Sequence, residues 1–184
     1  MLFRSLGTSM GGLIGMMLAA QPGTPIRRLV VNDIGPLIAK EGLDRIATYV
    51  GEDPSFADLG ELEAYQRRVA ATFGALTDAQ WRHLAEFGAR RKPDGTLGRA
   101  YDPSIAEAFK TVTGDIDLWP VWDAIKCPTL VLRGAQSDLL RPADAAAMTQ
   151  RGPKARLVEF PGVGHAPALM DADQIAVVER FLAD

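Results

Sequence analysis

The chain has 184 residues, of which 47% are apolar and 23% are charged, so it suits one globular domain or one domain with an insertion. Its net charge of −3 gives no electrostatic reason to expect nucleic acid or an acidic membrane as a partner. A single cysteine excludes an internal disulfide. Together with only two histidines, it gives too few ligands for a usual structural zinc site. We expect no metal and no organic cofactor.

Neither a membrane span nor a signal peptide is predicted. The longest apolar stretch, residues 13–20, is far shorter than the about 20 residues that cross a bilayer. The N-terminus lacks the charged, apolar and small-residue regions of a signal peptide in that order. A cytoplasmic location is therefore expected, and a single free cysteine suits it. That residue, Cys127, precedes a proline at a strand start, which predicts a buried, unreactive thiol.

The first elements in chain order are a helix and a strand. Residues 10–20 form an unbroken run of helix formers that stops at Gln-Pro-Gly, which predicts a helix. Residues 28–32 read Arg-Leu-Val-Val-Asn, a β-branched run typical of a buried strand. The Asp-Ile-Gly-Pro at 33–36 predicts a turn after it.

The middle of the chain is predicted to be helical. Amphipathic patterns indicate four helices, over residues 42–50, 59–73, 78–90 and 104–112. Asp58 with Glu61, and Thr77 with Gln80, have the spacing of capping boxes that open the second and third helices. No strand pattern interrupts the four helices. The single interruption is a Pro-Asp-Gly turn at residues 93–95. We interpret residues 37–118 as an inserted helical lid.

Strand and helix signals alternate in the last third of the chain. Strands are predicted over 129–133 and 155–160, and helices over 143–150 and 173–182. This rhythm implies right-handed crossovers and a parallel sheet with helices on both faces. The predicted fold class is α/β, with residues 1–36 and 119–184 forming the sheet core and residues 37–118 inserted into it.

A candidate nucleophile lies at the start of the first helix. Residues 7–11 read Gly-Thr-Ser-Met-Gly, the G-x-S-x-G pattern at a strand-to-helix turn. Such a turn holds the Ser9 hydroxyl exposed, strains its backbone, and needs glycines at 7, 11 and 12 where side chains would clash. The helix N-terminus would direct the Met10 amide at a developing oxyanion.

The pattern at Ser9 also has two other readings. Gly-rich loops that open helices bind phosphate, although no Gly-Lys-Ser or Gly-Lys-Thr is present. A merely structural turn is the second alternative. The pattern therefore needs partner residues before it indicates catalysis.

Two polar residues follow successive predicted strands. Asp138 comes after the strand at 129–133, and His165 lies in a Gly-rich loop after the strand at 155–160. Because parallel strands end at one edge of a sheet, both side chains are expected at the same edge. Asp138 has a second reading as a turn or helix-capping residue. The other histidine, His83, is expected to be a packing residue of a lid helix.

Three motifs together resemble the α/β-hydrolase superfamily, and most closely its single-domain bacterial hydrolases with a helical lid. They are Gly-Thr-Ser-Met-Gly-Gly at 7–12, Cys-Pro-Thr-Leu-Val-Leu-Arg-Gly at 127–134 leading to Ser-Asp, and Pro-Gly-Val-Gly-His-Ala-Pro at 161–167. The resemblance covers essentially the whole chain. It implies Ser9 as nucleophile, His165 as general base and acid, Asp138 as the residue that orients the imidazole, and Met10 as an oxyanion donor.

An alternative acid is Asp33, because some members of the superfamily carry the acid after the preceding strand. Asp138 fits its motif better. Asp33 is expected instead to hold the hinge turn of the lid at Gly35 and Pro36.

The implied reaction is hydrolysis of a small acyl substrate through an acyl-Ser9 intermediate. Esters, thioesters and the carbon–carbon bond of a diketone all remain open, and perhydrolysis uses the same triad. Some aromatic residues are candidates to line an apolar acyl pocket, although core packing is the expected role of most of them: Phe73, Trp81, Phe87, Trp119 and Trp122.

Ser9 lies close to the start of the chain. The resemblance implies that several strands, and a loop with a second oxyanion donor, precede the nucleophile in a complete member. We therefore expect a truncated chain whose Ser9 strand forms an exposed edge, open to self-association or to a complementing chain. Loss of one oxyanion donor costs about a hundred- to a thousandfold in rate, so weak activity is expected. The alternative to an enzyme is a non-catalytic fragment or interaction module with a vestigial triad.

Overall fold

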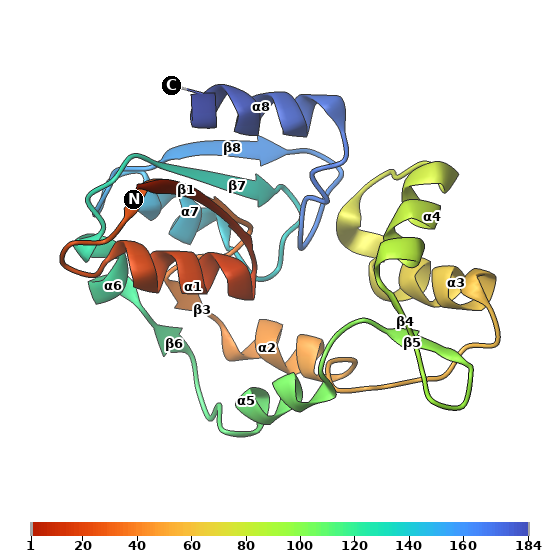
Figure 1. The fold of residues 1–184 in the computed structure, drawn as a ribbon. Helices are drawn as coiled ribbons and strands as arrows, with labels where there is room; N and C mark the ends of the chain where they lie inside the picture. The colour runs from red at the N-terminus through yellow and green to blue at the C-terminus, as the bar shows by residue number, and fades with distance from the viewer. Residues whose placement is uncertain (1, 184) are drawn as a thin grey trace.

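The computed structural model describes residues 2–183, and its centre is a four-stranded parallel sheet (Figure 1). The strands are β1 (Phe3–Thr8), β2 (Ile26–Asn32), β7 (Thr129–Gly134) and β8 (Arg156–Phe160), in the order β1-β2-β7-β8. All three neighbouring pairs are parallel, so the four carboxyl ends lie along one edge. The predicted α/β class is confirmed.

Helices cover both faces of the sheet. On one face, α1 (Met10–Ala19), α6 (Trp119–Ala124) and α7 (Pro142–Met148) contribute to a core cluster that includes Leu29 and Val131. On the other face, α8 (Ala172–Ala183) packs Phe181 against Val30 and Leu130. The alternation of neighbouring strand residues between the two clusters follows from the two-residue period of a strand. Among residues 2–183 no helix is long and apolar enough to cross a membrane.

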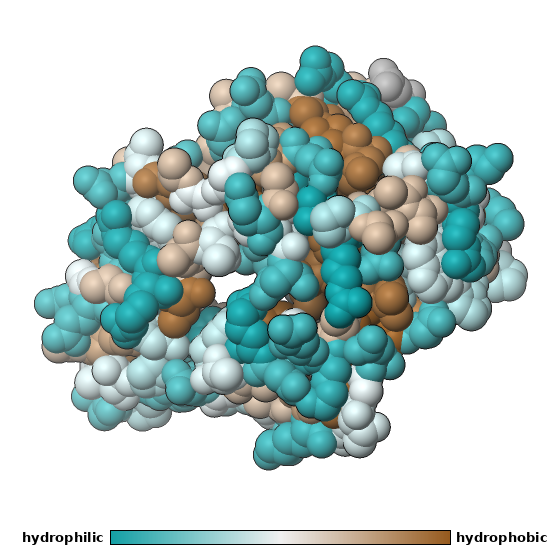
Figure 2. All heavy atoms as spheres, turned by 180° about the vertical axis from the view of Figure 1, so that it is seen from behind, coloured by the Kyte–Doolittle hydropathy of each residue, from teal (hydrophilic) through white to brown (hydrophobic). Residues whose placement is uncertain are grey.

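Among the strands of residues 2–183, β1 lies at the edge of the sheet and pairs with β2 alone. Arg4 and Ser5 are compatible with this strand because an edge strand is not buried on both faces. Large apolar side chains stay exposed beside it: Phe3 and Leu6 of β1 and Met10, Ile14 and Met17 of α1 are each 41–53% exposed. Figure 2 shows the side of the molecule that faces away from the viewer in Figure 1. This side is mostly hydrophilic with separate apolar patches, and it is hollowed between the insertion and the core.

The helical insertion leaves and rejoins the core through two short paired strands. β3 (Leu37–Ile38) and β6 (Ile116–Asp117) pair antiparallel at its base. Between them lie α2 (Lys40–Ala47), α3 (Leu59–Val69), the 3-10 turn η1 (Ala71–Phe73), α4 (Asp78–Phe87), β4 (Ala89–Arg91), β5 (Leu97–Arg99), the 3-10 turn η2 (Pro103–Ala106) and α5 (Glu107–Lys110). Figure 1 shows α3 and α4 beside the end of the sheet and α2 and α5 below it.

The insertion differs from its prediction because it contains short strands: the β3–β6 pair at its base and the β4–β5 hairpin. The Pro-Asp-Gly turn is the tip of a β4–β5 hairpin, so the expectation of helices without strands is wrong here. The turn is built by Asp94, which accepts hydrogen bonds from the amide and hydroxyl of Thr96, and by Gly95 at a φ of 86°. Because the hairpin follows directly, α4 ends at Phe87 rather than at residue 90. The Thr77 capping box that opens α4 is complete.

Candidate active site

Ser9 occupies the strained turn between β1 and α1. Its φ of 51° and ψ of −119° are unusual for a residue with a side chain. The surrounding backbone over-determines this conformation, because the Ser9 amide donates to the Asn32 carbonyl at 3.0 Å and the Ser9 carbonyl accepts from the Gly12 amide at 2.8 Å. The turn therefore presents Ser9 from a rigid frame.

Two of the three glycines around Ser9 are required by close contacts. A Cβ on Gly7 would lie 2.2 Å from the backbone of Gly11, and a Cβ on Gly12 would lie 2.6 Å from a methyl group of Ile34. At Gly11 itself a Cβ would meet nothing within 4 Å, so the expected clash does not exist there. The tight turn depends on the glycines at 7 and 12.

His165 joins Ser9 to a buried carboxylate, and that carboxylate belongs to Asp33. The His165 Nε2 atom lies 3.0 Å from Ser9 Oγ, and its Nδ1 atom lies 2.8 Å from Asp33 Oδ2. The side chain of His165 is 9% exposed and that of Asp33 is fully buried. An imidazole held in this way is able to accept the proton of the serine hydroxyl.

Asp33 has a fully buried carboxylate with three hydrogen-bond donors around it. Besides His165, the amide of Gly134 donates to Oδ1 at 2.8 Å, and the Ser137 hydroxyl donates to Oδ2 at 2.6 Å. Asp33 follows β2 with a φ of 56°, and its amide donates to the Leu132 carbonyl at 2.8 Å. A buried charge is tolerable only with such partners, and this arrangement replaces the hinge role expected for Asp33.

The structure corrects the prediction that Asp138 orients the imidazole. The Asp138 carboxylate, 49% exposed, forms an ion pair with the guanidinium of Arg45 on α2. Burial alone would lower the pKa of Arg45, but the hydrogen bond and charge of Asp138 outweigh it and raise that pKa. The preceding residue, Ser137, is the one that faces Asp33: its hydroxyl donates to the Asp33 carboxylate and accepts hydrogen bonds from the backbone amides of residues 139 and 140. This turn points the neighbouring Asp138 toward the insertion.

Two supporting residues of the site were not predicted from the sequence. Ser137 is one, and Asn32 is the other. The buried Asn32 amide group donates to the Thr8 hydroxyl at 3.0 Å and to the Pro167 carbonyl at 2.9 Å. It thus connects the turn of Ser9 with the loop of His165. An asparagine at the end of an otherwise apolar strand was the available signal.

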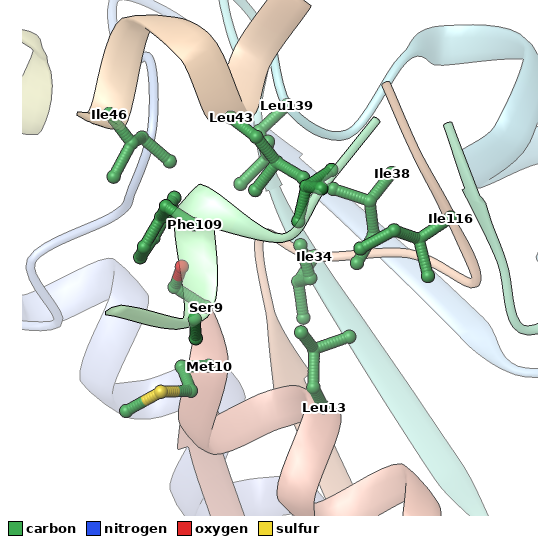
Figure 3. Close-up of a pocket in the computed structure, with 12 residues that line it drawn as sticks. Ser9, Met10, Leu13, Ile34, Ile38, Leu43, Ile46, Phe109, Ile116 and Leu139 are labelled. Carbon is green, nitrogen blue, oxygen red and sulfur yellow. The ribbon is translucent and has the colours of Figure 1, made fainter. Parts of the chain in front are cut away.

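An apolar cavity of about 210 Å³ opens beside Ser9 (Figure 3). Apart from Ser9 its lining is entirely apolar: Met10, Leu13, Ile34, Ile38, Leu43, Ile46, Ala108, Phe109, Val112, Ile116 and Leu139. In Figure 3 the side chains of Leu43, Ile46 and Phe109, which belong to the insertion, lie above Ser9, while Leu13 of α1 lies below it. The core and the insertion build this cavity together.

The aromatic residues predicted for an acyl pocket do not line this cavity. Phe73 and Trp81 line a separate cavity within the insertion, and Phe87 is 75% exposed. Trp122 is fully buried in the core, and Trp119 packs against the same core. The cavity wall is mainly aliphatic, because it is the first and last segments of the insertion that reach Ser9.

The remaining predicted residues have simpler surroundings. Met10 begins α1, whose first amides receive no side-chain cap from Ser9. His83 contacts Phe87 at 4.5 Å between ring centroids, which is a packing contact. Cys127 is half-buried rather than buried, and burial raises the pKa of its thiol. Within residues 2–183, no group of three or more potential metal ligands lies close together.

Known proteins are similar to this chain in both sequence and fold. A 3-hydroxybutyrate-oligomer hydrolase of Cupriavidus necator is 44% identical over 186 residues, which cover 95% of this chain and 63% of the relative. The structure of an alpha/beta hydrolase from Novosphingobium aromaticivorans matches with a TM-score of 0.87 and 36% identity, over 99% of this chain and 65% of that one. A solved structure from Rickettsia typhi matches with a TM-score of 0.88 and 30% identity, over 98% and 63%.

The chain thus spans slightly less than two thirds of the length of the relative and of these two structures. The profile of the Alpha/beta hydrolase family matches residues 6–179, which is nearly all of the chain. On the evidence of its fold, the strand-to-helix turn at Ser9 and its sequence, the chain belongs to the alpha/beta hydrolase family.

Proposed function

We propose that the chain carries the catalytic residues of a serine hydrolase for esters with an uncharged, aliphatic acyl group. Ser9 is the nucleophile, His165 the general base and acid, and Asp33 the carboxylate that orients the imidazole. The observation that carries the proposal is the unbroken line of contacts from Ser9 Oγ to His165 Nε2 at 3.0 Å and from Nδ1 to Asp33 at 2.8 Å.

The first half of the reaction forms an acyl-enzyme. The Ser9 oxygen attacks the ester carbonyl carbon while His165 Nε2 accepts the hydroxyl proton. The carbonyl electron pair moves to oxygen, and the buried Asp33 stabilises the imidazolium that forms. When the carbon–oxygen bond of the ester breaks, Nε2 returns the proton to the departing alkoxide, so an alcohol leaves and an acyl-Ser9 ester remains.

The second half repeats the sequence with water. His165 Nε2 takes a proton from a water molecule, whose oxygen attacks the acyl-Ser9 carbonyl. The tetrahedral species collapses, the carboxylic acid leaves, and the proton passes to the Ser9 oxygen. Both halves need the imidazole neutral and its Nδ1 atom protonated, and the Asp33 carboxylate favours that tautomer.

The oxyanion of each tetrahedral species is assigned to the uncapped N-terminus of α1. The Met10 amide and the dipole of a ten-residue helix favour negative charge at this point. One assigned donor gives incomplete stabilisation, so we expect slow turnover by these 184 residues. An activated ester, whose alkoxide leaves easily, is therefore the appropriate first substrate.

The class of acyl group is inferred from the cavity beside Ser9. Of the residues that the structure describes, Ser9 alone contributes a hydrogen-bonding side chain to its lining, and none contributes a charge. A carboxylate placed there would lose its hydration without gaining a partner, which is strongly unfavourable. Short aliphatic acyl chains fit this wall, and the relative that hydrolyses 3-hydroxybutyrate oligomers makes oligoesters of that acid a second substrate to test.

The test of the nucleophile is hydrolysis of p-nitrophenyl butyrate by the chain and by Ser9→Ala. We expect Ser9→Ala to lose the enzymatic rate, and a fluorophosphonate to label wild type at Ser9, as found by peptide mass spectrometry. Ser5→Ala, a change of the same type on the strand β1 that precedes Ser9, is the control and should keep the wild-type rate. Equal rates for Ser9→Ala and wild type would reject the nucleophile.

The test of the acyl class compares two esters of equal acyl length. We expect kcat/KM for p-nitrophenyl butyrate to exceed that for mono-p-nitrophenyl succinate by about a hundredfold or more, because only the second acyl group carries a charge into the cavity. Equal values for the two esters would reject the apolar class while leaving the nucleophile intact.

A further inference from the structure

The 3-10 turn η1 of the insertion lies directly against the loop that carries His165. The Thr72 hydroxyl donates to the His165 carbonyl at 2.7 Å, and the Thr72 carbonyl accepts from the Gly164 amide at 2.7 Å. Two consecutive residues of the loop are therefore bound by one residue that is 93 positions away from His165 in sequence.

The close approach of η1 depends on glycines on both sides. A Cβ on Gly164 would lie 2.9 Å from the Cβ of Thr72. Gly74, at a φ of 100°, brings the chain past Val163, where an added Cβ would lie 3.0 Å from a methyl group. Next to this contact, the Gln80 amide group donates to the Met170 carbonyl at 2.7 Å. The insertion thus holds the loop at several points.

The core holds the same loop on either side of His165. The Gln136 amide donates to the Val163 carbonyl at 2.8 Å, and Asn32 binds the Pro167 carbonyl. Within the described part of the chain, the hydrogen bond to the His165 carbonyl itself comes from Thr72. The backbone at the histidine is therefore fixed by the insertion, whereas its flanks are fixed by the core.

We infer that Thr72 is a positioning residue, through which the insertion holds the His165 imidazole within reach of Ser9. The inference rests on the proposed function of His165 and adds to it a role for the insertion beyond lining the acyl cavity. A shift of the His165 backbone would change the 3.0 Å separation between Nε2 and the serine oxygen, and proton transfer depends steeply on that geometry.

The test compares Thr72→Val, which keeps the shape and removes the hydroxyl, with Thr72→Ser, which keeps the hydroxyl. Thr72 is exposed, so neither change disturbs the core. We expect kcat for p-nitrophenyl butyrate to fall about tenfold in Thr72→Val with KM nearly unchanged, and to recover in Thr72→Ser. Thr48→Val is the matched control, because this exposed lid hydroxyl donates to its own helix at Arg45 and should leave kcat unchanged.

A second readout does not require turnover. The chain has two histidines, so the imidazole signals of a ¹⁵N-labelled sample are assignable with His83→Gln. In Thr72→Val we expect the His165 signals to shift or broaden while those of His83 stay in place, and Thr72→Ser to restore the wild-type spectrum. Gly164→Ala, which forces η1 away, should change the same signals as Thr72→Val.

Unchanged His165 signals in Thr72→Val would overturn the positioning role, whatever the activity of the chain. Full activity of Thr72→Val in a preparation that labels at Ser9 would overturn it as well. A wild-type chain that neither turns over ester nor labels at Ser9 would instead count against the proposed function, so the two failures are distinguishable.

Discussion

Asp33 and Asp138 follow neighbouring parallel strands, yet their surroundings are opposite. Asp33 is fully buried and accepts hydrogen bonds from His165, Gly134 and Ser137. Asp138 is half exposed and forms an ion pair with Arg45 of the insertion. One carboxylate is held by the core and faces the imidazole, and the other faces solvent and holds the insertion.

The comparison shows that position after a strand does not by itself define an acid. A buried carboxylate requires hydrogen-bond donors at fixed positions. The donors around Asp33 also fix the orientation of its carboxylate, so that one oxygen faces His165. An exposed ion pair needs no such frame and contributes about 0 to 1 kcal/mol. Substitutions at the two sites should therefore have very different consequences.

The largest effect is expected for Asp33→Asn. The amide keeps the shape but no longer favours the imidazole tautomer that accepts the Ser9 proton, so kcat/KM for p-nitrophenyl butyrate should fall by about 10³ to 10⁴. The measurement is the hydrolysis rate, with circular dichroism as a control for folding. A loss of less than tenfold in a folded variant would show that Asp33 does not orient His165.

A middle effect is expected for Ser137→Ala. Its hydroxyl donates to Asp33 and accepts two amides of the following turn, so removing it leaves a buried carboxylate with one donor fewer. The loss of one hydrogen bond to a charged group is worth about 1.5 to 3 kcal/mol, and we expect the free energy of unfolding in urea to fall by about that amount. Ser104→Ala, at an exposed turn of the insertion, should leave it nearly unchanged. Equal stability of Ser137→Ala and wild type would contradict the bridging role.

The smallest effect is expected for Asp138→Asn. Loss of its exposed ion pair with Arg45 should change kcat/KM by about twofold at most and stability by less than about 1 kcal/mol. Added salt should remove even this difference, because it screens the pair in wild type. A loss comparable to that of Asp33→Asn would show that Asp138, and not Asp33, is the carboxylate that orients His165.

Much of the fold was predictable, because short-range patterns determine it. The β-branched runs became β2 and β7, and the glycine-flanked Ser9 became the turn between a strand and a helix. The β4–β5 hairpin in the insertion was not predicted, since its two strands have three residues each and show no alternation of apolar and polar residues.

Which of the two aspartates contacts His165 was not predictable from local sequence. Both aspartates follow strands, and the difference is made by Ser137, which binds a residue 104 positions earlier. The cavity wall depends likewise on contacts distant in sequence, because Leu43 and Phe109 meet Ser9 only after the insertion folds back over the sheet. Sequence indicated which residue types the site needs, and tertiary packing selected among them.

The most direct test of the line from Ser9 through His165 to Asp33 is the nitrogen spectrum of the His165 imidazole, which needs no substrate. We predict that the neutral ring of wild type carries its proton on Nδ1, that Asp138→Asn leaves this tautomer unchanged, and that Asp33→Asn alters it. A ring that responds to Asp138→Asn and is indifferent to Asp33→Asn would contradict the account.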